Sequence, residues 1–149
     1  RMGSSIIYPA KQDACDIIEE YNDRFDRVLA DVPCSGLGVS HKKPDIKLKI
    51  EPEGINSMLE VQWRVLSNVA NYVKTGGVLV YSTCTINADE NQRMVAKFLT
   101  FYKNFEIEPI EDMLPEVLHK IVSPDGTIQL IPSRDFIDGF FIARLRRMK

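Results

Sequence analysis

Two apolar segments of the chain are each followed closely by a cysteine, and a long helical pattern lies between them. The first segment covers residues 27–31 and leads to Cys34, while the second covers 78–82 and leads to Cys84. Apolar runs of this length, bounded by turn residues, indicate buried strands. A strand, a crossover helix and a second strand form a parallel pair, so we expect both cysteines at the same sheet edge. Open α/β sheets collect their chemistry there, beyond the carboxyl ends of the strands.

The rest of the pattern is typical of an α/β domain in which strands and helices alternate. The clearest helix covers residues 54–74, where apolar side chains recur at helical spacing, and we expect Gly76 and Gly77 to end it. The other expected elements are a strand at 6–8, a helix at 14–21 capped by Asp13, a long loop at 32–53, a helix opened by a capping box at 87–90, and strands at 105–110, 127–131 and 140–145, the last two antiparallel.

Composition favours one globular domain in a reducing compartment. A chain of 149 residues with 44% hydrophobic residues is long enough to bury its own core. Its apolar runs are only as long as strands, so we expect no membrane span, and no secretory pattern opens the chain. Three cysteines without paired spacing argue against a disulfide framework, and the cytoplasm is therefore the expected location.

The charge of the chain does not indicate a protein that binds nucleic acid by charge alone. The formal net charge is −2, whereas such proteins are strongly basic. Basic residues nevertheless cluster twice, around residues 41–49 and 144–149. Each cluster is either a solvated segment or a set of phosphate contacts beside a site, with most of the RNA affinity supplied elsewhere.

Two thiols and the carboxylate of Asp31, which ends the first strand, are suited to covalent attack on a small electrophile followed by release. A thiolate is a strong nucleophile whose reactivity depends on its pKa and exposure. Each residue also has a structural interpretation, because a cysteine at a strand end is often a small core hydrophobe and an aspartate there can cap a turn. Cys15, in the expected helix at 14–21, keeps the structural interpretation. The pairing of the two loops favours chemistry more than any single residue does.

Three ordered motifs resemble those of the RNA cytosine-5 methyltransferases. They are Asp-Val-Pro-Cys-Ser-Gly-Leu-Gly at 31–38 with Lys-Pro-Asp-Ile-Lys at 43–47, Tyr-Ser-Thr-Cys-Thr-Ile-Asn at 81–87 with Glu90 and Asn91, and Asp-Gly-Phe-Phe-Ile-Ala-Arg-Leu at 138–145. Val32 stands where alanine is commoner in the family. The stretch at 43–47 is most similar to the bacterial Sun (Fmu) branch, which modifies the RNA of the small ribosomal subunit.

The resemblance implies a fold, a cofactor and a role for each residue. The implied fold is a Rossmann-like class I sheet, and the implied cofactor is S-adenosylmethionine. The implied substrate is a cytosine of RNA, and the similarity to the Sun branch points to 16S ribosomal RNA. Cys84 matches the nucleophile that attacks carbon 6 of cytosine, which makes carbon 5 able to attack a methyl donor. Cys34 matches the cysteine that helps to release the methylated RNA. Asp31 matches an acidic residue that touches both base and cofactor, and Asp13 matches the acidic position at the cofactor's adenosine end.

The family's glycine-rich cofactor loop and its acidic residue for the ribose do not occur in this sequence. We therefore expect residues 1–149 to be the C-terminal portion of the catalytic domain, without the first strands of the sheet or a separate RNA-binding domain. Such a chain is expected to bind S-adenosylmethionine weakly and to turn over little or not at all. A sheet that lacks its first strands exposes an edge and apolar faces, so self-association is also expected.

Other thiol chemistries fit the sequence less well. A cysteine phosphatase needs an arginine six residues after its cysteine, where this chain has Ser40 and Glu90, and no Cys-x-x-Cys redox motif is present. We expect no metal site, because His41 and His119 have no ligand spacing with the cysteines. A non-catalytic fragment that binds RNA or a partner stays open as the alternative.

Overall fold

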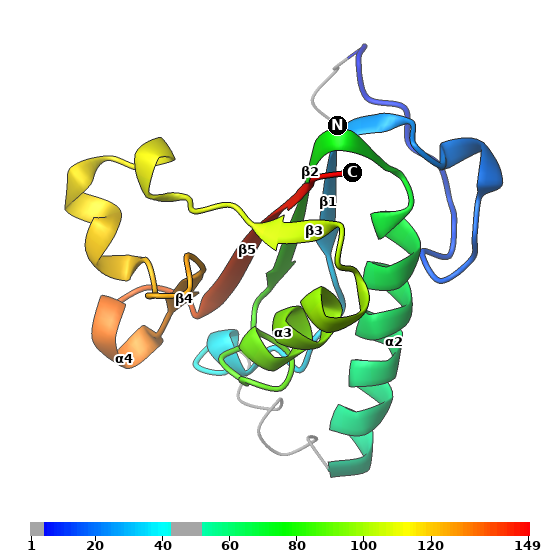
Figure 1. Ribbon diagram of the computed structural model, residues 1–149. Helices are drawn as coiled ribbons and strands as arrows, with labels where there is room; N and C mark the ends of the chain where they lie inside the picture. Colours follow the sequence, from blue (N-terminus) through cyan, green and yellow to red (C-terminus); the bar gives the residue numbers. More distant parts are fainter. Residues whose placement is uncertain (1–4, 43–51) are drawn as a thin grey trace.

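The computed structural model describes residues 5–42 and 52–149, and it contains a five-stranded mixed sheet (Figure 1). The strands follow the order β1-β2-β5-β3, and β4 pairs with β5 beside that path. The strands are β1 (Phe25–Asp31), β2 (Val73–Thr83), β3 (Phe105–Ile107), β4 (Ile128–Leu130) and β5 (Phe140–Arg147), and the helices are α2 (Pro52–Ala70), α3 (Gln92–Phe101) and the short α4 (Pro132–Asp135). The predicted α/β class is confirmed.

The strand pair at the centre of the prediction is present. β1 and β2 run parallel with α2 between them in the chain, and their register aligns Val28 with Leu79 and Asp31 with Ser82. The carboxyl ends of both strands therefore open on the same sheet edge, as the sequence predicts. The last two strands are antiparallel, which is also confirmed, because β4 pairs with β5 from Ile128 to Leu130.

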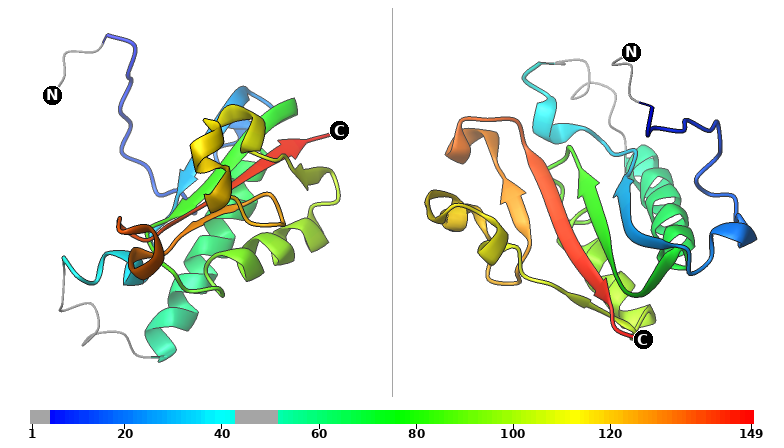
Figure 2. Two further views of the ribbon diagram at one scale, coloured as in Figure 1. Left: turned by 90° about the vertical axis from the view of Figure 1, so that its left-hand side faces the viewer. Right: turned by 90° about the horizontal axis from the view of Figure 1, so that it is seen from above.

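Helices α2 and α3 lie together against one face of the sheet (Figure 2). Leu66 of α2 and Phe98 of α3 are fully buried with the sheet residues beneath them. Phe98 stacks on Tyr102 and meets Phe105 edge to face, so the end of α3 and the start of β3 share one aromatic cluster. The apolar stripes of α2 and α3 thus cover the strands that lead to the cysteines, as their helical periodicity predicts.

Strand β1 is less buried than its sequence indicates. In the part of the chain that the structure describes, β1 pairs with β2 on one side only. Leu29 is 68% exposed whereas Ala30 is buried, because successive residues of a strand point to opposite faces and α2 and α3 cover the face of Ala30 (Figure 2). The apolar run correctly predicts a strand, but apolar composition alone does not distinguish an edge strand from a central one.

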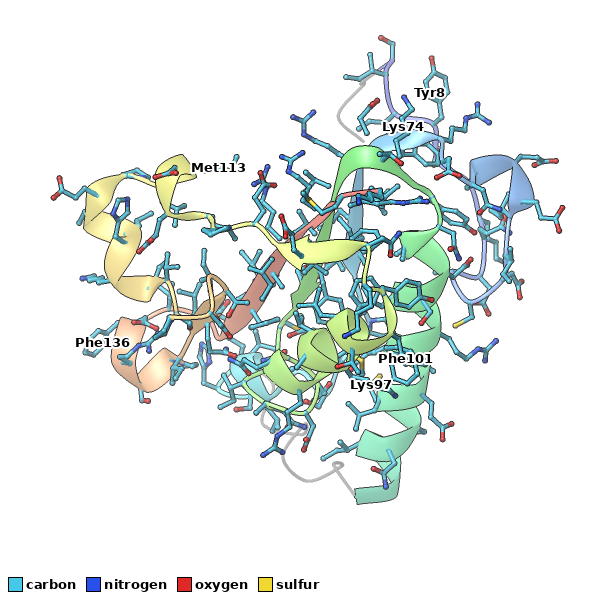
Figure 3. All side chains as sticks on the ribbon, in the orientation of Figure 1. Tyr8, Lys74, Lys97, Phe101, Met113 and Phe136 are labelled. Atoms are coloured by element: carbon cyan, nitrogen blue, oxygen red, sulfur yellow. The ribbon has the colours of Figure 1, made fainter. Side chains whose placement is uncertain are left out.

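The predictions for residues 6–8 and 14–21 are wrong. Residues 6–8 form no strand within the described chain, and Tyr8 is 88% exposed and projects away from the sheet (Figure 3). Instead of a helix at 14–21 there is a turn and then a single 3₁₀ turn at Glu19–Tyr21. The Asn68 side chain of α2 donates to the carbonyls of Ala14 and Asp16 at 2.9 and 2.7 Å, so α2 holds the segment in an irregular path.

Helix α2 ends at Ala70 rather than at 74, and Gly76 and Gly77 do not end it. They lie inside β2, where the pairing passes from Phe25 with Val73 to Arg27 with Val78. Gly76 takes a φ of +77°, and a Cβ on Gly77 would lie 2.8 Å from the Lys74 carbonyl oxygen. The two glycines therefore allow an irregular strand pairing, and glycine within a strand commonly marks such a site.

The described part of the predicted loop at 32–53 that follows β1, residues 32–42, contains a 3₁₀ turn at Leu37–Val39. Residues 43–51, which include the lysines of the first basic cluster beyond Lys42, lie outside the described residues. The expected strand at 105–110 is limited to Phe105–Ile107. Within residues 5–42 and 52–149, no helix has both the length and the apolar character needed to cross a membrane.

Candidate active site

The structure brings Cys34 and Cys84 into direct contact at the predicted sheet edge. Their Sγ atoms lie 3.3 Å apart, and both residues are half-buried. Cys34 follows β1 by three residues and Cys84 follows β2 directly, so the parallel register of the two strands sets this distance. The sequence prediction that the two cysteine loops meet is confirmed in geometry.

The two thiols do not have equal environments. Burial, together with the hydrogen bond to Cys84, raises the pKa of Cys34 to about 12. Cys34 is therefore a thiol at neutral pH and can donate the hydrogen bond to the sulfur of Cys84. A sulfur that accepts a hydrogen bond from a neighbouring thiol is the better placed of the two to act as a nucleophile.

Asp31 occupies the last position of β1, at the same edge as the cysteines. Its Oδ1 accepts a hydrogen bond of 2.7 Å from the Ser82 hydroxyl, which fixes the carboxyl group across the strand pair. The residue is exposed, so the carboxyl group can reach a ligand bound over the edge. The structure thus places all three predicted residues of the central constellation, Asp31, Cys34 and Cys84, at one end of β1 and β2.

Three loops are locked together beside the cysteines by a contact between two glycines. The Gly38 N–H donates to the Cys84 carbonyl at 3.1 Å, and the Gly139 N–H donates to the Gly38 carbonyl at 2.9 Å. A Cβ on Gly38 would lie 2.4 Å from the Gly139 carbonyl oxygen and 2.8 Å from that of Cys84. Only glycine allows the loop after β1, the loop after β2 and the start of β5 to approach this closely.

Glu90, which the family resemblance places in the second cysteine motif, has a role in the site that its local helix-start pattern does not indicate. The capping-box prediction is wrong, because α3 begins only at Gln92 with Asn91 at its N-cap, and the Asn87 side chain accepts the Asp89 N–H at 3.0 Å within the turn that precedes the helix. The Glu90 side chain instead turns inward, is fully buried, and accepts hydrogen bonds from Ser35, the residue after Cys34. A carboxylate near a predicted helix start is usually interpreted as a capping residue, and nothing in the local pattern separates the two roles.

A cavity of about 600 Å³ lies between the segment at 11–15 and α2. It contains Asp13, whose Oδ1 also accepts the Cys15 N–H at 2.8 Å, and it reaches Pro33, the residue before Cys34. The remaining lining is Lys11, Gln12, Ala14, Cys15, Val61 and Val65. An apolar wall with a carboxylate at its rim fits a nucleoside, whose base needs apolar contact and whose polar groups need acceptors.

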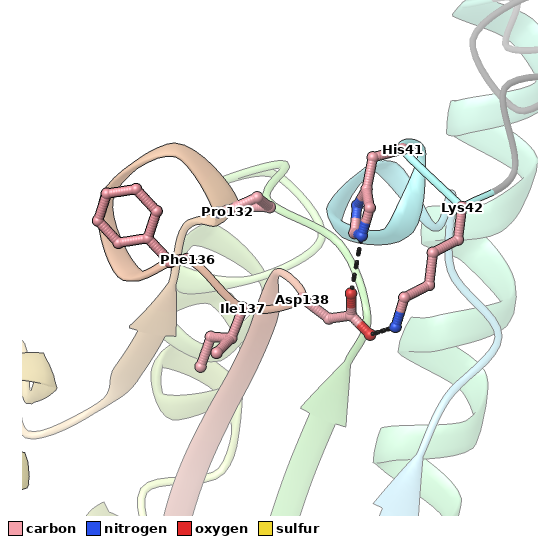
Figure 4. Close-up of a pocket in the computed structure, with 6 residues that line it drawn as sticks. All are labelled: His41, Lys42, Pro132, Phe136, Ile137 and Asp138. Atoms are coloured by element: carbon pink, nitrogen blue, oxygen red, sulfur yellow. Dashed lines mark hydrogen bonds and ion pairs between the residues drawn. The ribbon is translucent and has the colours of Figure 1, made fainter.

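The two basic clusters have different surroundings. His41 and Lys42 face a second cavity of about 570 Å³ and both contact Asp138, at 3.2 and 2.6 Å (Figure 4). Arg144 and Arg146 instead form ion pairs with Glu108, next to β3. The C-terminal cluster therefore takes part in the structure of the sheet, whereas the first borders the loops of the site. Among the residues placed by the structure, no group of three or more His, Cys, Asp or Glu side chains could hold a metal ion.

The chain matches the family model described as 16S rRNA methyltransferase RsmB/F over residues 1–146. It is 40% identical over 149 residues to the probable ribosomal RNA small subunit methyltransferase B of Bacillus subtilis, covering 99% of this chain and 33% of that protein. It is 37% identical over 126 residues to the ribosomal RNA small subunit methyltransferase F of Serratia proteamaculans, covering 84% of this chain and 26% of that protein.

Solved structures agree with these relatives. The crystal structure of PH0851 superposes with a TM-score of 0.84 at 32% identity, covering 97% of this chain and 32% of that one. NSun6 from Pyrococcus horikoshii, solved with SFG, an analogue of S-adenosylmethionine, gives a TM-score of 0.74 at 28% identity over 94% of this chain and 34% of that one.

This chain spans about a third of the length of the relatives it matches. The fold is that of a Rossmann-like methyltransferase, as the sequence predicts, and the resemblance to the Sun (Fmu) family is confirmed. From this match and these motifs together, the chain belongs to the RsmB/F family of 16S rRNA methyltransferases, which depend on S-adenosylmethionine.

Proposed function

We propose that this chain carries the catalytic cysteine pair for methylation of carbon 5 of a cytosine in RNA, with 16S ribosomal RNA as the substrate. The observation that carries the proposal is the 3.3 Å contact between Cys34 and Cys84 at the carboxyl edge of β1 and β2. The family match supports methylation of ribosomal RNA. The choice of cytosine carbon 5, and the covalent route to it, rest on the chemistry of two thiols beside a carboxylate.

In the first step, the Cys84 thiol passes its proton to the Asp31 carboxylate and its sulfur forms a bond to carbon 6 of a cytosine that has left its base stack. The electron pair of the C5–C6 double bond moves into the ring, where a proton from Asp31 at nitrogen 3 stabilises it. Carbon 5 is then an enamine carbon and can attack an electrophilic methyl group. Asp31 is suited to this role because the hydrogen bond from Ser82 holds its carboxyl group at the strand end.

S-adenosylmethionine supplies the methyl group when bound, and we assign its nucleoside end to the cavity that contains Asp13. Release follows when the proton on carbon 5 passes to solvent water, its electron pair restores the C5–C6 double bond, and nitrogen 3 returns its proton to Asp31. The C6–S bond breaks with its electron pair on the Cys84 sulfur. The Cys34 thiol donates a hydrogen bond to that departing sulfur, a role that its raised pKa and the 3.3 Å distance both favour.

Replacing Cys34 by alanine tests this assignment. In the full-length protein with its RNA and S-adenosylmethionine, Cys34→Ala should allow adduct formation but slow its breakdown, because the donor to the departing sulfur is lost. The covalent RNA–protein adduct should therefore accumulate on a denaturing gel while steady methyl transfer falls. The Cys34→Ala/Cys84→Ala double variant is the control and should form no adduct. An adduct level equal to wild type in Cys34→Ala would remove Cys34 from the release step.

Replacing Asp13 by asparagine tests the cofactor site. The Asn side chain keeps the acceptor for the Cys15 N–H and therefore the local turn, but it removes the carboxylate from the cavity rim. Affinity of the full-length protein for S-adenosylmethionine, measured by calorimetric titration, should fall about 10-fold. This is the size expected for one lost hydrogen bond to a charged group. Asp16→Asn, in the same turn but outside the cavity lining, is the matched control and should bind as wild type. Equal affinity of Asp13→Asn and wild type would contradict the assignment.

The domain organisation stays a prediction. We propose that the 149-residue chain alone binds S-adenosylmethionine weakly and turns over little, as expected for one part of a catalytic domain. Micromolar, saturable binding by the isolated chain would contradict this. Location in the cytoplasm and self-association of the chain also stay predictions, and the non-catalytic RNA- or partner-binding fragment is the alternative for the chain in isolation.

A further inference from the structure

We propose that Glu90 is a positioning residue for the release step, because its buried carboxylate holds the backbone that carries Cys34 against the Cys84 loop. The inference rests on the proposed function and adds to it a residue that makes no contact with substrate. Packing alone does not explain why the Glu90 carboxylate is buried. Glu90 is 0% exposed, and carboxylates are almost never buried to this extent unless they are paired or fully hydrogen-bonded.

The carboxylate of Glu90 lies among donors from three different segments. Oε2 accepts the Ser35 N–H at 2.8 Å and the Gln62 amide at 2.9 Å. Oε1 accepts the Ser35 hydroxyl at 2.5 Å and the Asn87 amide at 3.2 Å. These donors belong to the loop after β1, to α2, and to the loop after β2. The described residues place no cation in an ion pair with Glu90, so hydrogen bonds of this kind are what stabilise its buried charge.

The arrangement acts on Cys34 through its two neighbours in the chain. Glu90 holds Ser35 on one side of the cysteine, and Gln62, itself bound to Glu90, donates to the Pro33 carbonyl at 3.0 Å on the other side. The backbone on both sides of Cys34 is thus fixed to a carboxylate that belongs to the Cys84 loop. Because Glu90 is covalently part of that loop, the same contacts help to hold the two sulfur atoms at the distance to which the strand register brings them.

The Cys84 loop has a separate anchor. Asn91 accepts the Thr83 hydroxyl at 2.6 Å and donates to the Thr85 carbonyl at 3.0 Å, which fixes the backbone on both sides of Cys84. Loss of the Glu90 contacts therefore should release Cys34 while leaving Cys84 held. This separation gives a specific expectation: the Cys84 adduct should still form, and its breakdown should be slow.

A glutamine at position 90 is the conservative variant, and its hydrogen bonds can be derived. With its oxygen in the place of Oε2, it accepts from both the Ser35 N–H and Gln62 as before. Its NH₂ group then donates to the Ser35 hydroxyl, which can turn toward Thr85 Oγ1 at 2.8 Å. The Asn87 amide at 3.2 Å and the Thr85 hydroxyl at 3.4 Å lose their acceptor, and neither belongs to the loop that carries Cys34. Glu90→Gln should therefore keep Cys34 in place, whereas Glu90→Leu should not.

The test compares variants of the full-length protein in methyl transfer and in trapped covalent adduct, using its ribosomal RNA and S-adenosylmethionine. Glu90→Leu should lower turnover by about 10- to 100-fold while the adduct accumulates, as in Cys34→Ala, because a displacement near 1 Å has effects of this size. Glu90→Gln should stay within about threefold of wild type in both measurements. Phe98→Leu, a buried substitution in the aromatic cluster of α3, controls for lowered stability and should not accumulate adduct.

Each outcome decides the proposal. Equal loss of adduct formation and turnover in Glu90→Leu would mean a merely structural role, and unchanged values would mean no role. If Glu90→Leu does not fold, Ser35→Ala removes the hydroxyl contacts alone and must still shift the balance toward adduct. Normal adduct levels in Ser35→Ala would then overturn the proposal. If Cys34→Ala itself accumulates no adduct, the proposed release step fails and this inference fails with it, which separates that case from a failure of Glu90 alone.

Discussion

A Cys84→Ala variant of the full-length protein is expected to lose methyl transfer to RNA, with a fall on the order of 10⁴-fold or more. Removal of a covalent nucleophile has effects of this size because the other groups cannot replace the bond it forms. Without the C6–S bond, carbon 5 of cytosine stays a poor nucleophile, so substrate binding alone gives no turnover. The covalent adduct should also be absent, since Cys84 is the residue through which the RNA is held.

The measurement is incorporation of a labelled methyl group together with denaturing-gel detection of the adduct. Thermal unfolding of Cys84→Ala should match wild type, because the half-buried thiol loses only a sulfur atom at the sheet edge. Affinity for S-adenosylmethionine should also be unchanged, since Cys84 does not line the cavity that contains Asp13. Residual methylation above about 1% of wild type would show that another residue is the nucleophile.

The second large effect is expected from Gly38→Ala, a change of one methyl group outside the reacting atoms. The new Cβ would lie 2.4 Å from the Gly139 carbonyl oxygen and 2.8 Å from that of Cys84. Both of those neighbours are backbone atoms, so the loops themselves must move apart. We expect a loss of about 1–3 kcal/mol in the free energy of unfolding, the usual range for overpacking. Methyl transfer should fall about 100-fold, because the Cys84 loop shifts with the contact.

Gly54→Ala is the matched control for this substitution. Gly54 lies in α2 and is exposed, and a Cβ added there would have no neighbouring atom within 4 Å. Alanine at this position should leave methyl transfer unchanged and raise stability slightly, by about 0.5–1 kcal/mol at most, through its better helix propensity. Thermal unfolding and a methyl-transfer assay on both variants check the pair. Wild-type activity in Gly38→Ala would mean that the three loops need no close contact.

The parts of the fold that the sequence predicts correctly are those set by local apolar patterning. The runs before Cys34 and Cys84 fall in adjacent parallel strands, and the helical stripe between them covers the sheet. Parallel pairing through a crossover leaves little choice of geometry, so the meeting of the two cysteine loops follows from three local patterns. The predicted helix at 14–21 fails for the opposite reason, because the distant Asn68 side chain holds that segment's carbonyl groups.

The parts of the site that the sequence does not predict depend on contacts between distant residues. Ser35 and Glu90 are 55 positions apart, and Gly38 and Gly139 are further apart still, so no local pattern records either pair. Glu90 fits a helix-start signal, and Gly76 and Gly77 fit a helix-end signal, yet each serves another purpose. A residue type that suits two roles is assigned by its tertiary neighbours, which single-sequence reasoning does not contain.

The position of β5 within the sheet has a consequence for how the protein forms. β5 lies between β2 and β3 and also pairs with β4, although it is the last of these strands in the chain. During vectorial synthesis on the ribosome, every strand that flanks β5 therefore emerges before the strand that joins them. The non-local contacts of β5 are made late, and Gly139 at its start completes the three-loop contact only then. A nascent chain that stops short of residue 139 thus holds both cysteines without the third loop that packs beside them.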